Sequence, residues 1–228
     1  MAAVSVPLES TPVAQPGRLR ITETFLSLQG EADAVGWPTF FIRLTGCPLR
    51  CRYCDTTYSF HGGEWRDILG LVEAAQASGA RHVCVTGGEP LAQPRCLELL
   101  RQLCDAGLQV SLETSGALDI REVDPRVSRV VDLKTPASGE QERNRYENLD
   151  FLTPRDQLKF VLCDRPDYEW ARAQVMERRL HERCQVLFSP SWGQLEAATL
   201  AGWIVEDRLP VRFQVQLHKL LWGDTPGR

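Results

Sequence analysis

The stretch TFFIRLTGCPLRCRYC, residues 39–54, joins a strand-like apolar run to three closely spaced cysteines. Residues 39–45 are rich in β-branched and aromatic side chains, which predicts a strand, and Gly46 follows it. Cys47, Cys51 and Cys54 then lie on one short loop with the spacing C-x3-C-x2-C. This spacing indicates a metal or iron–sulfur site that begins where the strand ends.

The number of cysteines narrows the kind of site. A structural zinc ion takes four protein ligands, and electron-transfer iron–sulfur clusters usually take four thiolates. The next cysteine, Cys84, lies inside a predicted strand, and His61 has no second histidine at the spacing of a zinc finger. Three thiolates around a four-iron cluster leave one iron open to a further molecule. The triplet therefore favours a [4Fe–4S] cluster with an open iron, with structural zinc as the alternative.

Outward from this loop, short apolar runs alternate with longer amphipathic segments. Strands are predicted at residues 39–45, 82–86, 109–113, 129–133, 157–162, 184–188 and 211–217. Helices are predicted at residues 65–77, 95–106, 167–180 and 194–205. Such alternation is typical of an α/β fold in which helices cover a parallel sheet. Six to seven strands are too few for a closed barrel of eight, so we expect a partial, open parallel β/α barrel.

A second unusual segment, VTGGEP at residues 85–90, ends the next predicted strand. Two glycines let the backbone approach a ligand closely, and Glu89 offers a carboxylate to an ammonium group. Polar loops also end later strands, at residues 113–116, 132–140 and 189–192. Because the carboxyl ends of parallel strands share one edge of the sheet, we expect these loops to form the rim of one pocket.

Composition limits the partners of the chain. Its formal net charge of −4 gives no attraction to nucleic acid or to an anionic membrane. No stretch approaches the roughly 18 apolar residues of a membrane span, and the N-terminus lacks the pattern of a signal peptide. We expect a cytoplasmic protein, with residues 1–19 as a flexible extension and residues 20–228 as one domain. Five further cysteines are expected to fill the core: Cys84, Cys96, Cys104, Cys163 and Cys184.

The cysteine triplet and the GGE segment resemble those of the radical S-adenosylmethionine (SAM) superfamily. In that superfamily the open iron binds the methionine part of SAM, and cleavage of SAM yields a 5′-deoxyadenosyl radical that removes a hydrogen atom from the substrate. Other segments are similar to the 7-carboxy-7-deazaguanine synthase family: ITETFLSLQGE (21–31), FIRLTGC (41–47), CDTTY (54–58), DLKTPASGE (132–140) and VQLHKLLW (215–222). The resemblance covers nearly the whole chain, from about Arg20 to Trp222.

The resemblance implies an activity. That family converts 6-carboxy-5,6,7,8-tetrahydropterin to 7-carboxy-7-deazaguanine, with loss of ammonia, in the biosynthesis of queuosine and other 7-deazapurines. Its members are radical SAM lyases that use SAM catalytically, need Mg²⁺ and are usually homodimers on a modified partial barrel. An electron donor such as flavodoxin is implied as a partner.

The resemblance also assigns residues to each ligand. The cluster is expected on Cys47, Cys51 and Cys54, and Mg²⁺ on Thr56, whose hydroxyl is a hard oxygen ligand. Contacts with SAM are expected from Tyr53, Cys54, Asp55, Gly88, Asp132, Leu133, Lys134, Ser189, Pro190, Ser191 and Trp192. Contacts with the pterin are expected from Leu28, Gln29, Gly30, Arg43, Thr86 and Glu113. Arg43 is expected to hold the substrate carboxylate, a role that suits its planar donor fork.

Two other functions share parts of this pattern. A glycyl-radical-enzyme activase has the same cysteine loop in a short chain, but it does not need the LSLQGE segment or Arg43. A non-catalytic iron–sulfur module requires four protein ligands. His218 and Lys219 are compatible with either a surface pair or the edge of the pocket, and they stand outside the predicted site.

Overall fold

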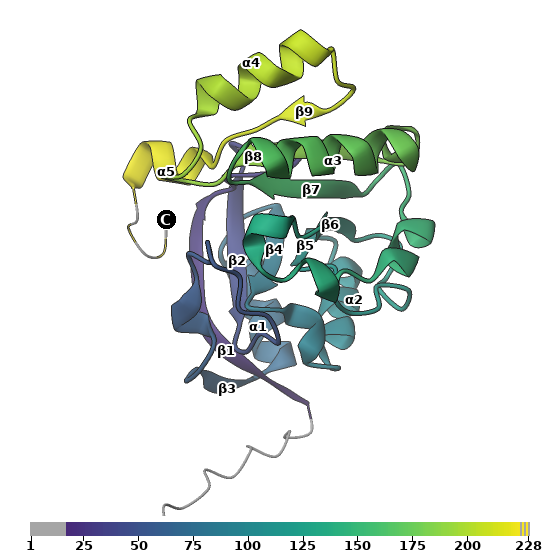
Figure 1. The fold of residues 1–228 in the computed structure, drawn as a ribbon. Coiled ribbons are helices and arrows are strands. Elements are labelled where there is room, and N and C mark those ends of the chain that lie inside the picture. Colours follow the sequence, from purple (N-terminus) through teal and green to yellow (C-terminus); the bar gives the residue numbers. More distant parts are fainter. Residues whose placement is uncertain (1–16, 224, 226, 228) are drawn as a thin grey trace, which may run out of the picture.

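Parallel strands in chain order form the main part of the sheet in this computed structural model, which describes residues 17–223, 225 and 227 (Figure 1). They are β2 (Pro38–Leu44), β4 (His82–Gly87), β5 (Gln109–Thr114), β6 (Ser128–Asp132), β7 (Gln157–Leu162), β8 (Gln185–Pro190) and β9 (Arg212–Phe213). The strand order of the described sheet runs from β3 at one edge to β9 at the other without closing. The partial, open parallel β/α barrel expected from the sequence is confirmed.

Two antiparallel strands that the sequence patterns do not predict extend the sheet beyond β2. β1 (Arg18–Leu28) pairs along β2, and its first residues pair with β3 (Glu64–Asp67). The helix predicted at residues 65–77 is therefore wrong for its first three residues. Helix α1 (Ile68–Ala77) begins only after Asp67, whose side chain accepts a hydrogen bond from the Gly70 amide and so caps the helix.

The start of β1 also corrects the expected N-terminal extension. Arg18 and Leu19 pair with β3, and the Leu19 side chain is buried, so both residues belong to the folded sheet. Gly17 is also described, as a turn residue whose carbonyl accepts from the Ile68 amide at 3.1 Å, and the remaining residues of the predicted extension, 1–16, lie outside the described residues.

Three other predicted helices are present within a few residues of the expected bounds: α2 (Cys96–Asp105), α3 (Arg165–Glu177) and α4 (Ala197–Asp207). The last predicted strand, 211–217, is mostly wrong, because β9 has only two residues and helix α5 (Leu217–Trp222) follows closely. Short 3₁₀ helices lie in the loops: η1 (Thr57–Ser59), η2 (Pro90–Ala92), η3 (Pro136–Ser138), η4 (Gln141–Arg143), η5 (Tyr146–Phe151) and η6 (Leu180–Glu182).

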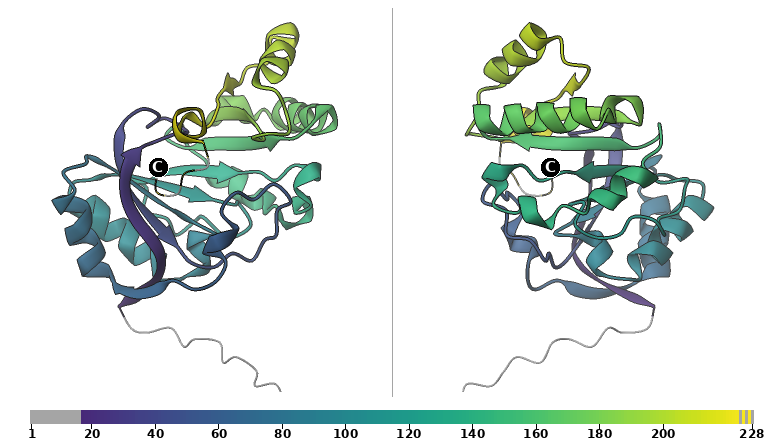
Figure 2. Two further views of the ribbon diagram at one scale, coloured as in Figure 1. Left: turned by 90° about the vertical axis from the view of Figure 1, so that its left-hand side faces the viewer. Right: turned by 45° about the vertical axis from the view of Figure 1, so that its right-hand side comes forward.

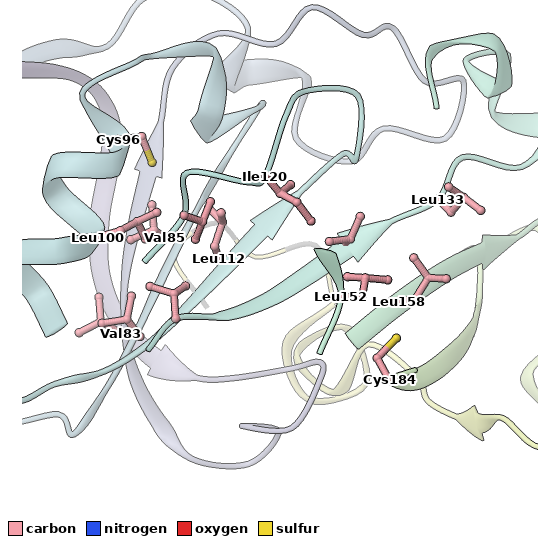
Figure 3. Close-up of a cluster of buried hydrophobic side chains, with 14 of the residues drawn as sticks. Val83, Val85, Cys96, Leu100, Leu112, Ile120, Leu133, Leu152, Leu158 and Cys184 are labelled. Atoms are coloured by element: carbon pink, nitrogen blue, oxygen red, sulfur yellow. The ribbon is translucent and has the colours of Figure 1, made fainter. Parts of the chain in front are cut away.

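Alternation along the strands separates a core face from a cavity face. On β4, Val83 and Val85 belong to the hydrophobic core that the sheet shares with helices α1 to α4 (Figure 3). Cys84 and Thr86, which alternate with them, line a cavity. On β7, Leu158 lies in the same core while Lys159 lines the cavity. Because successive side chains of a strand point to opposite faces of the sheet, these polar side chains lie on its concave face.

The cysteines outside the triplet follow this division. All are free thiols. Cys96 and Cys184 belong to the hydrophobic core, and Cys104 packs against it, as expected. Cys84 is buried but faces the cavity, and Cys163 is only half-buried and does not belong to that core. Cys84 is thus buried as expected, on the cavity face of its strand, and the core role is wrong for Cys163.

Figure 2 shows the open sheet from two sides. Side chains connect two segments near its opposite ends. The loop after β1 meets the chain around β9: the Ala32 amide donates to Gln214 Oε1 at 2.9 Å, and Arg212 pairs with Asp33 at 3.0 Å. The Leu217 amide then donates to the Gly30 carbonyl at 3.0 Å. The residues after β9 therefore lie beside the loop that follows β1. No helix in the described part of the chain is long and apolar enough to cross a membrane.

Candidate active site

One cavity of about 340 Å³ collects nearly all of the residues that the sequence singles out. Its wall includes the three cysteines of the triplet, the ends of the parallel strands and, from α5, His218 and Lys219. The predicted residues that line it are Leu28, Gln29, Arg43, Cys47, Cys51, Tyr53, Cys54, Asp55, Thr56, Thr86, Gly88, Glu113, Asp132, Lys134, Ser189, Pro190, Ser191 and Trp192. Residues from eight segments of the chain therefore meet at one place, as a shared rim at the strand ends predicts.

Gly30 and Leu133 are the two exceptions. The Leu133 side chain is buried in the hydrophobic core on the other face of the sheet (Figure 3). Gly30 lies against His218, where an added Cβ would come within 2.1 Å of the ring Nδ1. The side-chain positions give no support to the predicted ligand contacts of these two residues, and Gly30 instead allows α5 to approach.

The cysteine loop is fixed by backbone contacts with the loop after β6. The Arg52 amide donates to the Ser138 carbonyl at 3.0 Å, and the Arg50 amide donates to Glu140 Oε1 at 2.6 Å. Within the loop, the Cys54 amide donates to the Cys51 carbonyl at 3.2 Å. These bonds hold three half-buried thiols on one wall of the cavity.

Two glycines let the end of β4 approach this loop. The Glu89 amide donates to the Gly46 carbonyl at 2.8 Å. A Cβ on Gly88 would lie 2.3 Å from that carbonyl oxygen and 2.7 Å from Cys47 Cβ, and one on Gly87 would lie 2.4 Å from the Leu44 carbonyl oxygen. Only glycine fits at position 88 without moving the cysteine loop, and at position 87 without moving the end of β2. The GG pair is explained by close packing as well as by any ligand.

The ligand role expected for Glu89 is wrong. Its side chain is fully buried, and its oxygens accept hydrogen bonds from the Leu91 amide, the Thr114 hydroxyl and the amide and hydroxyl of Ser115. Glu89 does not line the cavity. It fixes the end of β5 to the end of β4, so its carboxylate shapes the rim without reaching a ligand.

The three thiols of the cysteine loop keep their protons more tightly than exposed cysteines, so they need a metal to become thiolates. Burial raises the pKa of Cys47 and Cys54 and raises that of Cys51 to about 11, while Lys134 acts in the opposite direction on all three. Such thiols become thiolates when cationic iron replaces the proton. Among the described residues, no three His, Cys, Asp or Glu side chains are close enough to hold a single metal ion. Ligands of a multi-iron cluster bind separate irons and need not converge.

Asp132, Lys134 and Tyr53 form a polar wall next to the cysteines. Lys134 Nζ lies 2.9 Å from Asp132 Oδ2 and 5.7 Å from the centre of the Tyr53 ring. Burial alone would lower the pKa of Lys134, but Asp132 and its neighbours raise it, so the ammonium keeps its charge. The other carboxylate oxygen, Asp132 Oδ1, and the Tyr53 hydroxyl are buried without a hydrogen-bond partner in the described structure. Unsatisfied buried polar atoms indicate that a polar ligand belongs here, which fits SAM.

The turn after β8 completes this side of the cavity. Ser189 and Ser191 are buried, and the Ser191 amide donates to the Leu162 carbonyl at 2.8 Å. Trp192 is about half exposed at the mouth. Trp192 is therefore available to cover a ligand that enters beside the cysteine loop.

Arg43 faces the same cavity from β2. Its Nε donates to Glu23 Oε1 at 2.7 Å, and Tyr58 donates its hydroxyl hydrogen to the same oxygen at 2.8 Å. The guanidinium carbon lies 5.9 Å from the ring centres of both Phe25 and Tyr58. The terminal nitrogens make no hydrogen bond with any described residue, so the fork is oriented and open to an anion.

Thr56 and Asp55 lie at the mouth beside Cys54. The Thr56 hydroxyl donates to Asp55 Oδ1 at 2.8 Å, and Asp55 Oδ2 lies 3.6 Å from Lys219 Nζ on α5. Two hard oxygen atoms are thus adjacent, a pairing that suits Mg²⁺. His218 and Lys219 both line the cavity, so of the two alternatives left open for this pair the structure shows the pocket edge.

Deeper in the cavity lies a charged group that the sequence does not reveal. Lys159 Nζ contacts Glu31 Oε2 at 2.8 Å and Glu113 Oε2 at 3.1 Å. Burial would raise the pKa of Glu31, yet Lys159 lowers it to about 2; the pKa of Glu113 is raised by burial and by Glu31. Glu31 belongs to the LSLQGE segment, which the family resemblance places at the pterin site. Nothing in the strand QLKFVL distinguishes Lys159 from an ordinary surface lysine.

Comparisons with known proteins agree with this geometry. The sequence model of the Radical SAM superfamily matches residues 41–131. The chain is 44% identical over 208 residues to the 7-carboxy-7-deazaguanine synthase of Chlorobaculum tepidum, covering 90% of this chain and 94% of that protein. It is 41% identical over 227 residues to the Koribacter versatilis synthase, covering 92% and 100%.

A solved structure adds a match in three dimensions. The crystal structure of QueE from Escherichia coli has a TM-score of 0.69 and 25% sequence identity, and the match covers 88% of this chain and 95% of that one. Sequence and fold thus agree over nearly the whole length, and the chain belongs to the 7-carboxy-7-deazaguanine synthase family of the radical SAM superfamily.

Proposed function

We propose that the chain converts 6-carboxy-5,6,7,8-tetrahydropterin to 7-carboxy-7-deazaguanine with loss of ammonia, a ring contraction in the biosynthesis of queuosine and other 7-deazapurines. One observation carries the proposal: the cysteine triplet shares its cavity with an anion-binding group, Arg43, and a hydrogen-bond acceptor, Glu113. A carboxylated pterin offers a matching anion and matching N–H donors. The named relatives support the same reaction.

Cys47, Cys51 and Cys54 would hold the [4Fe–4S] cluster. When bound, the cluster and SAM supply the radical that removes a hydrogen atom from the substrate. Tyr53, Asp132 and Lys134 would contact SAM, because these residues line the cavity next to the cysteines and include a charged group and two buried polar atoms without partners. Asp55, Gly88 and the turn Ser189–Trp192 complete the proposed cofactor contacts.

The substrate would lie between Arg43 and Glu113. Arg43 binds the carboxylate through its free terminal nitrogens, while Glu23 keeps the guanidinium oriented. Thr86 pairs with Arg43 across adjacent strands and lines the same wall. Leu28 and Gln29 line the cavity from the end of β1. These residues orient the pterin and keep water from the reacting ring.

We also propose Mg²⁺ at Thr56, with the Asp55 carboxylate beside it, because this pair gives hard oxygen atoms at the mouth of the cavity. A homodimer in the cytoplasm and an electron donor such as flavodoxin complete the proposal, as the family resemblance implies. One domain over residues 20–228 is supported by the single main core, which extends from β1 to α4.

The test is anaerobic reconstitution with iron and sulfide, followed by incubation with reductant, SAM, Mg²⁺ and carboxytetrahydropterin. We expect carboxydeazaguanine and ammonia in equal amounts, detected by chromatography with mass spectrometry. A fully loaded cluster that cleaves SAM but yields no deazapurine would refute the proposal.

The other two functions are not favoured. A glycyl-radical-enzyme activase would form 5′-deoxyadenosine in response to a partner enzyme and not to the pterin. A non-catalytic module would show no spectral change of its cluster on addition of SAM. The full-length similarity to named synthases supports the pterin reaction over both.

A further inference from the structure

Lys159 is buried, lines the cavity and contacts two carboxylates that come from distant parts of the chain. Its ammonium lies 2.8 Å from Glu31, which follows β1, and 3.1 Å from Glu113 on β5. Only 7% of Lys159 is exposed. The contacts proposed for the cluster, SAM and the pterin do not include it.

The two carboxylates differ in their remaining contacts. Glu31 Oε1 accepts from Gln216 Nε2 at 3.0 Å, and Glu31 Oε2 accepts from Lys159 and, at 3.4 Å, from Gln214 Nε2. Both oxygens of Glu31 are therefore occupied. Glu113 accepts only through Oε2, from Lys159, and its Oε1 has no hydrogen bond with any residue that the structure describes. Lys159 thus fixes Glu113 Oε2, while Glu113 Oε1 is available to a ligand in the cavity.

The charges of this group do not balance. Two carboxylates share one ammonium, whereas the neighbouring Asp132 is paired with its own Lys134. An excess negative charge in a buried site is costly unless a hydrogen-bond donor or a cation meets it. We therefore expect the ligand beside Lys159, Glu31 and Glu113 to present N–H donors to the carboxylates.

The substrate of the proposed function carries such an edge. The pyrimidine part of a pterin has an exocyclic amino group next to a ring N–H, and these two donors point in one direction. With Oε2 of Glu113 held by Lys159, the remaining oxygen, Oε1, can accept from this donor edge. An analogue with an oxo group in place of the amino group would present an acceptor to Glu113 instead of a donor.

We propose that Lys159 is a positioning residue that makes the site specific for the aminopyrimidine edge. Anchored by Glu31, and through Glu31 by Gln216, it holds one oxygen of Glu113 and so directs the other toward the substrate. The inference rests on the proposed function. A purely structural Lys159, which only compensates buried charge, would affect stability and total activity but not the choice between two substrates.

The experiment compares 6-carboxytetrahydropterin with its 2-oxo analogue, the corresponding tetrahydrolumazine, on holoenzyme variants. Wild type should prefer the amino compound by at least about a hundredfold in kcat/KM, because a site built to hydrogen-bond an N–H rejects an analogue that lacks it. Lys159→Met should reduce this preference to within about tenfold, mainly through KM for the amino compound, and Lys159→Arg should restore part of it. Iron content and substrate-independent cleavage of SAM should not change.

Two variants separate positioning from stability. The double variant Glu31→Gln, Lys159→Met removes both charges of the ion pair. It is measured in place of the single variant Lys159→Met if the single variant does not fold. Arg129→Met removes another buried cation, which pairs with Asp156 at 2.6 Å and does not line the cavity, and it should leave the preference unchanged.

The outcomes are distinct. An unchanged preference in the folded Lys159 variants, with both substrates slowed equally, would overturn the inference. A wild-type enzyme that makes no product from the pterin would instead refute the proposed function. Product formation by wild type together with a lost preference in the Lys159 variants supports both.

Discussion

Glu23 binds Arg43 through the guanidinium Nε at 2.7 Å and so leaves the two terminal nitrogens directed to the cavity. The pair joins neighbouring antiparallel strands, since Glu23 lies opposite Arg43 in the register of β1 and β2. Glu23 thus holds the Arg43 guanidinium in place through Nε, and the two terminal nitrogens of Arg43 are available to a ligand.

Replacement of Arg43 by lysine should weaken substrate binding. Lysine keeps the charge but cannot hold Glu23 and also make two parallel bonds to a carboxylate, a loss of about 1.5–3 kcal/mol. KM for the carboxypterin should rise about ten- to a hundredfold, while substrate-independent formation of 5′-deoxyadenosine stays at the wild-type rate. Steady-state kinetics with both assays checks this, and an unaltered KM would remove Arg43 from the carboxylate site.

Cys51→Ala should abolish assembly of the cluster, because two thiolates cannot hold four irons in place. Iron and sulfide content after reconstitution, together with the visible absorbance of the cluster, should fall to background. Cys104→Ala is the matched control, since that half-buried thiol lies on α2 and does not line the cavity. Full iron content in the Cys51 variant contradicts the ligand assignment.

Gly88→Ala should displace the cysteine loop. The new Cβ would lie 2.3 Å from the Gly46 carbonyl oxygen, a backbone atom that cannot rotate away. We expect a loss of about 1–3 kcal/mol in unfolding free energy and incomplete cluster loading. Gly202→Ala provides the control, because nothing lies within 4 Å of its added Cβ in helix α4 and alanine favours the helix. Normal loading and stability in the Gly88 variant would show that the loop yields without cost.

Thr56→Ala should change the response to Mg²⁺. If the hydroxyl is a ligand, its loss leaves the ion with fewer oxygen atoms of the protein, and the Mg²⁺ concentration for half-maximal rate should rise severalfold. Titration of metal-free enzyme with Mg²⁺ gives this value. Thr57→Ala is the control, because the neighbouring Thr57 is exposed and does not line the cavity. Equal titration curves for both variants would place the ion elsewhere.

Asp156→Asn should destabilise the protein in a pH-dependent manner. Burial alone would raise the pKa of Asp156, but hydrogen bonds from Arg129 and Thr153 lower it below its usual 3.8. A folded-state pKa below the unfolded value gives stability that is present above about pH 4 and is lost as the pH falls through the folded-state pKa. The variant should be less stable by about 3 kcal/mol at neutral pH. In chemical denaturation the difference should shrink below pH 4, and a constant difference would argue against the carboxylate as its source.

Local patterns predicted the elements that depend on nearby residues. Alternation and turn residues located the parallel strands from β2 to β8, and the spacing of Cys47, Cys51 and Cys54 located the cluster loop. β1 was missed because most of its side chains are only partly buried, so it shows no clean alternation. β1 is a strand because it pairs with β2 and β3, which come later in the chain. A pattern within β1 alone does not reveal that pairing.

The parts of the site that escaped prediction depend on distant partners. Lys159 is 128 residues from Glu31 in the chain, and only the fold brings the two into contact. Glu89 was expected at a ligand because its motif is polar, yet Thr114 and Ser115 occupy its oxygens. In both cases the residue type was visible in the sequence, while the set of hydrogen-bond partners was not.

The loop after β1 and the segment around β9 are joined by side chains, and this has a consequence for the end of the chain. A protein truncated after Phe213 would keep every parallel strand but lose Gln214 and Gln216, the two amides that hold Glu31. Glu31 and Lys159 would then be open to water on that side. Gln214, Gln216 and helix α5 therefore close one side of the pocket around Glu31 and Lys159 without contributing a strand to the sheet.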